Sequence, residues 1–439
     1  MGARETALNV LISCRREDGW SNGVLKAELK KDQLDRREAA LATRLCYGIL
    51  QNRITLDFYL KQLLTGKLKD LHPAVRDILH LGLYQLYLMD KIPESAAVNE
   101  SVTLAKKYCK KQRNASGLVN AVLRNAVRRK EELKKPATLE QRYSHPEKLI
   151  NLLEKDLGAE RTEGMLQADN EIPPTVIQVN TLKTTAARLY QELLDAGVGV
   201  EIHPWLKDCL ILTATGNIES LDAFREGRFY VQDAAAKLSV LCAQLPEKED
   251  FRVLDCCASP GGKSFASAMA MGGKGEIISC DVYPHKAELI GKGAARLGIE
   301  NLTPMTQDAT VFRPEWENAM DAVIADVPCS GYGIIRKKPD IRYKDPDKMA
   351  ELPALQLQIL ENQARYVKPG GLLLYSTCTV LRRENEDVVK KFLETYPDFS
   401  VEKLPLPDVF PENTTGMLTL VPGEYDTDGF FICRLRRNV

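Results

Sequence analysis

The chain has 439 residues, more than one ordinary hydrophobic core organises, so two or three domains are expected. With 44% hydrophobic and 27% charged residues it is typical of a globular protein, and no apolar run approaches the roughly 18 residues of a membrane helix. The 11 cysteines are scattered without a C-x-x-C pair, and the first residues form no apolar signal segment. These features favour the cytoplasm over export.

The formal net charge of zero hides an asymmetry between the two ends of the chain. Residues 1–135 contain 26 Lys and Arg against 15 Asp and Glu, an excess of 11 positive charges that the remainder must balance. A basic segment on an otherwise acidic protein indicates an anionic partner, nucleic acid first. A well-solvated helical surface is the alternative reading.

Residues 1–135 are predicted to be entirely helical. Leu41, Leu45 and Ile49 recur at a spacing of four, which is typical of one face of an amphipathic helix. Pro73 and Pro93 fall where helices would start. A dense basic run, residues 128–135, ends this segment.

Residues 137–235 combine both kinds of element. Helices are expected at 147–157 and 185–196, and short strands at 175–179 and 210–212, with Pro173-Pro174 interrupting the chain. This pattern predicts a small α+β module.

From residue 236 onward, strands and helices alternate. Strands are expected at 253–256, 276–280, 322–325, 372–375 and 430–435, and helices at 285–297 and 384–396. Such alternation predicts a doubly wound, mostly parallel sheet, in which ligands bind at the carboxyl ends of the strands.

The first of these strands leads into a glycine-rich turn that is typical of a nucleotide-type cofactor. The turn consists of Cys257-Ala258-Ser259-Pro260-Gly261-Gly262-Lys263. Asp281 follows 19 residues after Gly262, a spacing at which a carboxylate accepts hydrogen bonds from a ribose, and Asp308 could contact an adenine edge. A phosphate-binding P-loop is the alternative, but it needs a glycine where Cys257 stands.

Two cysteines follow two later strands. Cys329 lies in Asp326-Val-Pro-Cys329, and Cys378 lies in Ser376-Thr-Cys378. Two thiols at strand ends beside a cofactor loop suggest covalent attack on a weak electrophile such as carbon 6 of cytosine, with Asp326 hydrogen-bonded to the base and Lys263 able to lower a thiol pKa. The plain alternative is that both are small buried hydrophobes. The five histidines form no ligand-like cluster, so no metal is expected.

These ordered motifs resemble the NOL1/NOP2/Sun family of RNA cytosine-5 methyltransferases. The residues that carry the resemblance are Cys257–Lys263, Asp281, Asp308, Asp326–Cys329, Lys338-Pro-Asp-Ile341, Ser376-Thr-Cys378, Glu384-Asn-Glu386 and Asp428-Gly-Phe-Phe431. Ser259 stands where alanine is usual, and Gly423 where many relatives have histidine. The resemblance spans essentially the whole chain.

The resemblance implies a multidomain fold. It consists of a NusB-like all-α RNA-binding domain at 1–135, an α+β RNA-binding module at 137–235 and an α/β Rossmann-like S-adenosylmethionine-dependent methyltransferase domain at 236–439. The implied partner is 16S ribosomal RNA or an early small-subunit assembly intermediate, with no membrane and a monomeric chain.

The resemblance also implies individual roles. Cys378 would be the nucleophile and Cys329 would help to release the product, with Asp326 and Lys263 as further catalytic groups. The cofactor would contact residues 257–263, Asp281, Asp308 and Asp326.

Two alternatives remain open at this point. The same chemistry could act on tRNA, DNA or another RNA, or the chain could be an RNA-binding assembly factor with a vestigial catalytic domain. The intact thiols speak against the second. The basic residues Arg336, Lys337, Lys338 and Arg342 have two readings, a contact with the substrate backbone or a solvated basic loop.

Overall fold

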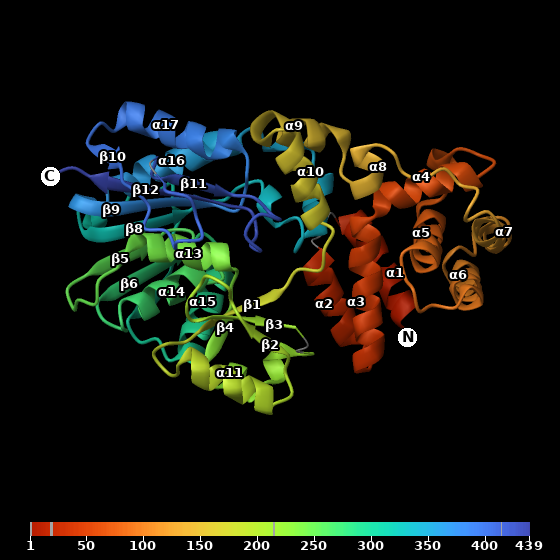
Figure 1. Cartoon of the computed structure of the whole chain (residues 1–439), viewed down its shortest axis with the longest axis horizontal. Helices are drawn as coiled ribbons and strands as arrows, with labels where there is room; N and C mark the ends of the chain where they lie inside the picture. The colour runs from red at the N-terminus through yellow and green to blue at the C-terminus, as the bar shows by residue number, and fades with distance from the viewer. Residues whose placement is uncertain (1, 18–20, 214–215, 414) are drawn as a thin grey trace. The chain divides into compact units, whose positions relative to one another are not determined.

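The computed structural model describes residues 2–17, 21–213, 216–413 and 415–439, and its chain forms two compact units (Figure 1). The first, called here the helical unit, comprises the chain up to Asn170 together with Lys337–Lys344. The second, the α/β unit, comprises Glu171–Arg336 and Asp345–Val439. None of the described helices is long and apolar enough to cross a membrane.

The helical unit contains no strand among its described residues, as predicted for residues 1–135. Pro73 begins α5, and Pro93 is the N-cap of α6, both as expected. Its helices are α1 (Ala3–Glu17), α2 (Ser21–Asp32), α3 (Arg36–Gln51), α4 (Arg53–Leu63), η1 (Leu68–Asp70), α5 (Pro73–Tyr87), α6 (Glu94–Tyr108), α7 (Ala115–Arg128), α8 (Leu139–Tyr143), α9 (Glu147–Leu157), α10 (Ala159–Ala168) and η5 (Pro339–Tyr343).

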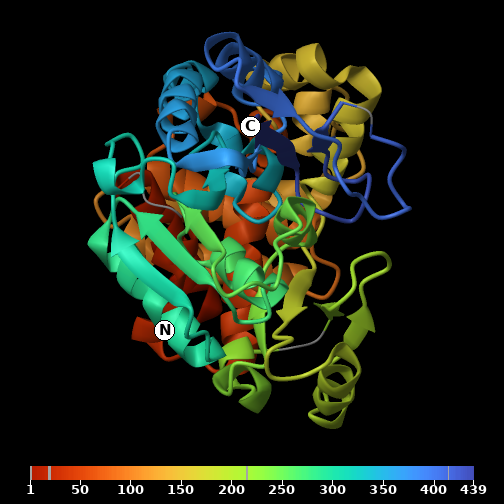
Figure 2. The same ribbon diagram turned by 90° about the vertical axis from the view of Figure 1, so that its left-hand side faces the viewer.

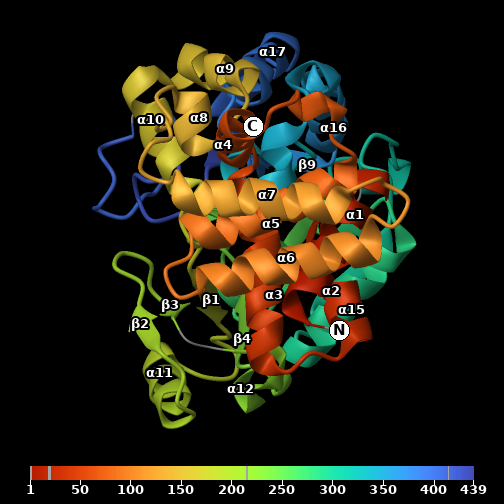
Figure 3. The same cartoon turned by 90° about the vertical axis from the view of Figure 1, so that its right-hand side faces the viewer.

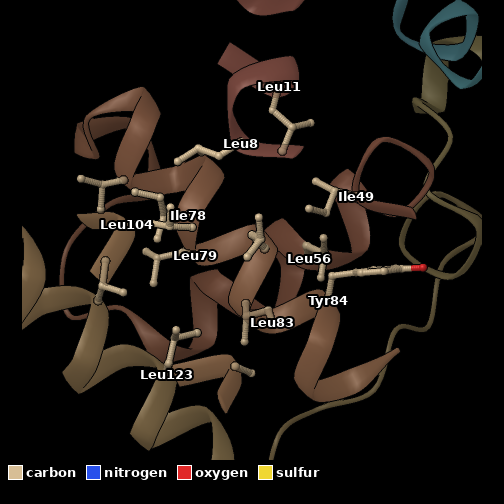
Figure 4. Packing of buried hydrophobic residues seen from close by; sticks show 14 of the residues in the cluster. Leu8, Leu11, Ile49, Leu56, Ile78, Leu79, Leu83, Tyr84, Leu104 and Leu123 are labelled. Atoms are coloured by element: carbon tan, nitrogen blue, oxygen red, sulfur yellow. The ribbon is translucent and has the colours of Figure 1, made fainter. Parts of the chain in front are cut away.

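Helix α5 lies at the centre of this unit, because apolar residues surround it. Ile78, Leu79 and Leu83 on α5 are completely buried, and α6 and α7 pack beside it (Figures 3 and 4). Gly48 on α3 lets the α5 ring of Tyr84 approach closely, since a Cβ at Gly48 would lie 2.0 Å from that ring. Of the stripe predicted on α3, Leu45 and Ile49 are buried in this core and Leu41 packs against it.

The segment Lys337–Lys344 is distant in sequence from the rest of the helical unit but folds with it. Its Arg342 is fully buried, and the guanidinium donates to five neutral oxygens. The shortest bonds go to Asn170 Oδ1 at 2.8 Å and to Gln51 O at 2.9 Å. Next to it, the Tyr343 hydroxyl donates to Leu50 O at 2.6 Å. These bonds fasten the segment to the ends of α3 and α10.

A small antiparallel sheet opens the α/β unit, and it has the mixture of strands and helices predicted for the α+β module, although residues 137–170 of that module fold with the helical unit. The sheet has the order β2-β3-β1-β4, and one helix crossover precedes β2 and another precedes β4. Its elements are β1 (Thr175–Val179), α11 (Ala186–Asp195), β2 (Val200–Ile202), β3 (Cys209–Leu212), η2 (Ile218–Ser220), α12 (Asp222–Arg225) and β4 (Phe229–Val231).

A larger, mostly parallel sheet forms the rest of this unit (Figure 2), as the alternating pattern predicted. Its order is β10-β12-β9-β8-β5-β6-β7, with β11 paired to β12; β9, β8, β5, β6 and β7 are parallel, and β12 is antiparallel. The strands are β5 (Arg252–Asp255), β6 (Glu276–Asp281), β7 (Leu302–Thr306), β8 (Met320–Asp326), β9 (Val367–Thr377), β10 (Phe399–Val401), β11 (Met417–Leu420) and β12 (Phe430–Arg437). The helices are α13 (Ala234–Ala243), α14 (Gly262–Ala270), α15 (Pro284–Leu297), α16 (Leu352–Ala364) and α17 (Glu386–Thr395).

Both faces of the larger sheet are buried, which explains its continuous apolar runs. Val253 packs into one core cluster and its neighbour Leu254 into another, and Ala322 and Val323 alternate in the same way. Successive side chains of a strand point to opposite faces, so helices must cover both. The parallel strands then leave their carboxyl ends together at one edge.

Candidate active site

The two cysteines singled out in the sequence meet because their strands are neighbours in register. Strands β8 and β9 are parallel, and Asp326 lies opposite Ser376. Cys329 follows three residues after Asp326, and Cys378 two residues after Ser376, so both loops leave the same edge of the sheet. The two Sγ atoms lie 3.2 Å apart, and each cysteine is partly exposed.

Hydrogen bonds hold the two cysteine loops to each other. Ser330 Oγ and Thr379 Oγ1 lie 2.8 Å apart, and the Gly333 amide donates to Cys378 O at 3.0 Å. The Cys329 loop is further pinned by the turn before β12, where the Gly429 amide donates to Gly333 O at 2.7 Å. A Cβ at Gly333 would lie 2.2 Å from Gly429 O, so only glycine fits this approach.

A buried carboxylate beneath these loops had no role assigned from the sequence. Glu384 is fully buried, and its Oε2 accepts from the Ser330 amide at 2.8 Å and from Gln356 Nε2 at 3.0 Å. Gln356 also donates to Pro328 O at 3.0 Å. The predicted helix 384–396 is confirmed as α17, which begins two residues later, after the short turn η7 (Arg382–Glu384). Glu384 could have been noticed in the sequence, because it is an acidic residue shortly after the strand end that carries Cys378. Gln356 has no such signal in the sequence.

Lys263 and Asp326 form an ion pair between the cofactor turn and the Cys329 strand. Lys263 Nζ lies 2.6 Å from Asp326 Oδ2, and Ser376 Oγ donates to Asp326 Oδ1 at 2.9 Å. The ammonium also sits 4.9 Å from the centre of the Phe430 ring. Lys263 is 9% exposed, whereas the Asp326 side chain is 27% exposed, so the carboxylate is the partner that reaches the open edge.

The glycine-rich turn connects β5 to α14 as predicted. Gly261 adopts φ +109°, a conformation that favours glycine, and a Cβ there would also lie 2.4 Å from the Phe265 ring. Behind the turn, the fully buried Asp255 accepts from Ser264 Oγ at 2.7 Å. Burial raises the pKa of Asp255 to about 7, although the Ser264 hydrogen bond and the Lys263 charge oppose the shift.

The two acidic residues expected at the cofactor lie at the ends of the next strands. Asp281 ends β6 and is 7% exposed; its Oδ1 accepts from the Tyr283 amide at 3.1 Å, and its Oδ2 has no hydrogen-bond partner in the described chain. Asp308 follows β7 and is exposed, with Oδ1 accepting from Thr310. The Gln307 amide donates to Asp281 O at 3.0 Å, which joins the two strand ends.

The two thiols differ in their surroundings. The hydrogen bond with Cys378 contributes most to raising the pKa of Cys329 well above its usual range, followed by burial and by the charges of Cys378, Glu384 and Asp326. Across the 3.2 Å contact either thiol can donate to the other Sγ. Among the described residues, no group of three or more His, Cys, Asp or Glu could hold a metal ion.

The reading of Arg336 and Arg342 as contacts with the substrate backbone is wrong. Arg336 is 6% exposed and pairs with Asp428 at 3.3 Å inside the α/β unit. Arg342 is sealed inside the helical unit. Both guanidinium groups bond to partners inside their own unit, because buried donors need partners, and neither is available to RNA. Lys338 is exposed, and its role stays a prediction.

Comparison with known proteins gives matches along the whole chain. Residues 1–128 match the NusB family, 145–219 a ferredoxin-like domain of RsmF/B-like methyltransferases, and 242–436 the family described as 16S rRNA methyltransferase RsmB/F. The order β2-β3-β1-β4 with two helix crossovers agrees with the ferredoxin-like match.

Curated relatives and solved structures cover similar extents. The "Probable ribosomal RNA small subunit methyltransferase B" of Bacillus subtilis is 37% identical over 99% of this chain and 98% of its own. The Vibrio cholerae "Ribosomal RNA small subunit methyltransferase B" is 33% identical over 93% and 91%. The crystal structure of PH0851 has 28% identity and a TM-score of 0.82, covering 100% of this chain and 99% of that one. A methyltransferase homologue from Pyrococcus horikoshii has 26% identity and a TM-score of 0.58, covering 68% and 97%.

Proposed function

This chain belongs to the 16S rRNA methyltransferase RsmB/F family, and we propose that it methylates carbon 5 of one cytosine in 16S ribosomal RNA through a covalent adduct. The observation that carries the proposal is the pair of thiols 3.2 Å apart at the ends of β8 and β9, beside the Lys263–Asp326 ion pair. A methyltransferase that acts on an oxygen or an exocyclic nitrogen has no need of a thiol pair there.

The residues at the edge of the sheet fit S-adenosylmethionine, which supplies an electrophilic methyl sulfonium when bound. The unpartnered Oδ2 of the nearly buried Asp281 is an acceptor suited to a ribose hydroxyl. The glycine-rich turn offers backbone without side chains at the N-terminus of α14. Asp308 lies beyond β7, where an adenine edge would be read.

Cys378 is assigned as the nucleophile and Cys329 to product release, as the resemblance carried by Ser376-Thr-Cys378 and Asp326–Cys329 implies. Carbon 5 of cytosine is a poor nucleophile until a thiolate bonds to carbon 6 and pushes electron density towards carbon 5. Cys329, with its Sγ 3.2 Å from Cys378 Sγ, is assigned to the elimination step that releases the product, so its loss should trap the covalent adduct. After methylation, a base removes the proton from carbon 5, the C5–C6 double bond reforms, and the bond from Cys378 to carbon 6 breaks.

Asp326 is assigned to hold the base. Its carboxylate is fixed from two sides, by Lys263 Nζ and Ser376 Oγ, yet it remains partly exposed at the ligand edge. A hydrogen bond that the amino group of cytosine donates to this carboxylate would orient carbon 6 towards Cys378. The ion pair with Lys263 holds the carboxylate in place.

We divide the chain as predicted, into residues 1–135, the module 137–235 and the catalytic domain 236–439. The first two parts are assigned to binding the substrate RNA. The target base would be turned out of its stack to reach Cys378, as in other enzymes that act on a base. The cytoplasmic location, a monomeric state and an assembly intermediate as substrate belong to the same proposal.

Methyl transfer from labelled S-adenosylmethionine to unmethylated 16S rRNA tests this function, with tRNA as the alternative substrate. Wild type should form 5-methylcytosine in 16S rRNA, Cys378→Ala should form none, and Cys329→Ala should accumulate a covalent protein–RNA adduct. Cys14→Ala removes a thiol of the helical unit and serves as the control. An adduct that appears in Cys378→Ala instead would reverse the two assignments, and transfer to tRNA alone would refute the substrate.

A further inference from the structure

A basic hollow lies in the helical unit. The residues that line it are far in the sequence from Cys329 and Cys378. It has a volume of about 480 Å³ and lies where α4 ends, η1 follows and α5 begins. Its lining consists of Lys61, Gly66, Lys67, Leu68, Lys69 and Arg76. Four of these six residues are cationic, and none is acidic.

The three lysines of this hollow are available for a ligand. Lys61, Lys67 and Lys69 are exposed, and none lies within ion-pairing distance of a carboxylate in the described part of the chain. Arg76 is different, because both it and His80 bond to Asp57. These two bonds outweigh burial and keep the pKa of Asp57 below its usual range, so that carboxylate stays charged and holds Arg76. The excess positive charge therefore resides on the lysines.

The basic run that ends the helical segment continues this surface. Gln62, next to Lys61, joins the two: its Oε1 accepts from the Lys134 amide at 2.9 Å, and its Nε2 donates to Lys134 O at 3.2 Å. Arg129 Nη1 also donates to Gln62 O at 3.4 Å, although Glu132 lies 3.4 Å from its Nε. The α4 basic surface is defined as Lys61, Lys67, Lys69, Arg129 and Lys134.

We propose that the α4 basic surface binds the phosphate backbone of the RNA substrate, an inference that rests on the proposed function. Flexible ammonium groups around an open hollow suit phosphates, which contribute affinity and register without reading bases. The hollow offers no aromatic ring for stacking among its lining residues, so base recognition is left to the catalytic edge. This surface would hold the RNA while Cys378 acts on one base.

The salt dependence of RNA binding by the full chain tests the proposal. The variant Lys61→Gln/Lys67→Gln/Lys69→Gln is compared with Lys106→Gln/Lys110→Gln/Lys111→Gln, which removes three exposed lysines of the same unit that do not line the hollow. The hollow variant should bind a 16S rRNA fragment roughly 10- to 100-fold more weakly, and its slope of log K against log[KCl] should fall by about 2 to 3. The control should keep the slope of the wild type. Thermal unfolding should be unchanged in both.

Methylation measured on the same proteins separates this inference from the proposed function. The hollow variant should raise KM for RNA and keep kcat at saturating RNA, since its lysines do not touch the reacting base. Equal affinity and slope in the hollow variant and the wild type would overturn the proposal. Lost binding of a polyglutamate probe with unchanged RNA binding would assign the surface to an acidic protein instead, and also overturn it. If wild type binds RNA in this way but makes no 5-methylcytosine, the proposed function fails while the surface stands.

Discussion

The two units each bury a cation, and they surround it differently. Arg342 in the helical unit is completely buried and donates to five neutral oxygens. Lys263 in the α/β unit is nearly as buried, yet it bonds to a carboxylate that is partly exposed at the ligand edge. Burial therefore does not distinguish a structural cation from a functional one. The partner of the cation distinguishes the two. The neutral oxygens around Arg342 form a buried hydrogen-bond network, whereas the carboxylate that pairs with Lys263 is partly exposed at a strand end and remains available to a substrate.

The largest expected effect is on the free energy of unfolding, when the hydrogen bonds of Arg342 are lost. Arg342→Met removes a donor from five oxygens, of which Tyr143 O keeps the bond from Asn170 Nδ2, and breaking a buried polar network of this kind costs about 3–5 kcal/mol. Denaturant unfolding of the full chain should show the loss in the transition of the helical unit. Arg37→Met, an exposed arginine of the same unit, should change little. A loss below about 1 kcal/mol for Arg342→Met would remove the distinction between the two cations.

A change in the Lys263–Asp326 ion pair should alter the rate of methyl transfer rather than the stability of the fold. Asp326→Asn keeps the shape but weakens the hold on Lys263 and on the base, so methyl transfer should fall about 10²- to 10³-fold. Asp321→Asn on the same strand is the matched control, because Asp321 pairs with Lys368 at 2.8 Å near the other end of β8. Equal activity losses in the two variants would show that Asp326 acts only as a structural pair.

A third effect concerns the buried carboxylate behind the cofactor turn. The pKa of Asp255 is raised to about 7 by burial, so its contribution to stability is full below the ordinary carboxyl range and is lost as pH rises through about 7. Asp255→Asn keeps an acceptor for Ser264 and removes the charge, so it should stabilise the α/β unit by about 2 kcal/mol at pH 8 and less at pH 5.5. Melting of the ligand-free protein across this range measures it, with exposed Asp250→Asn as control. A pH-independent difference would contradict the shift.

The smallest expected effect is on the pH dependence of stability, and it comes from His145 in the helical unit. Burial, followed by the charge of Arg342, lowers the pKa of His145, although Asp169 at 3.2 Å opposes this. The unfolded chain then binds a proton that the folded chain does not, so stability is lost as pH falls through the ordinary imidazole range. His145→Gln should flatten this slope, by on the order of 1 kcal/mol between pH 7.5 and 5.5. Exposed His72→Gln should leave it unchanged, and a slope equal to that of wild type in His145→Gln would exclude His145 as its source.

Much of the fold could be predicted from periodicity. Runs such as Ala322–Ala325 are apolar on both sides because helices cover both faces of the sheet, and that pattern is local. The cysteine and aspartate positions could also be predicted, because in a parallel sheet every residue just after a strand lies at the same edge. The position of Glu384 past a strand end was visible, but its bond to Ser330, 54 residues away, was not. Gln356 left no signal at all, since its partner Pro328 lies 28 residues away.

By itself the sequence determined the helical and alternating segments, the order of the motifs and the strand ends at which Asp281, Asp326, Cys329 and Cys378 lie. Only the tertiary structure decided that the two Sγ atoms come within 3.2 Å and that Lys263 pairs with Asp326. It also decided that Arg342, one candidate for a substrate contact, is instead buried in the helical unit. The physical reason is that periodicity reports how exposed a residue is on its own element, whereas the partner of a buried charge is set by strand register and by chain segments far away in sequence.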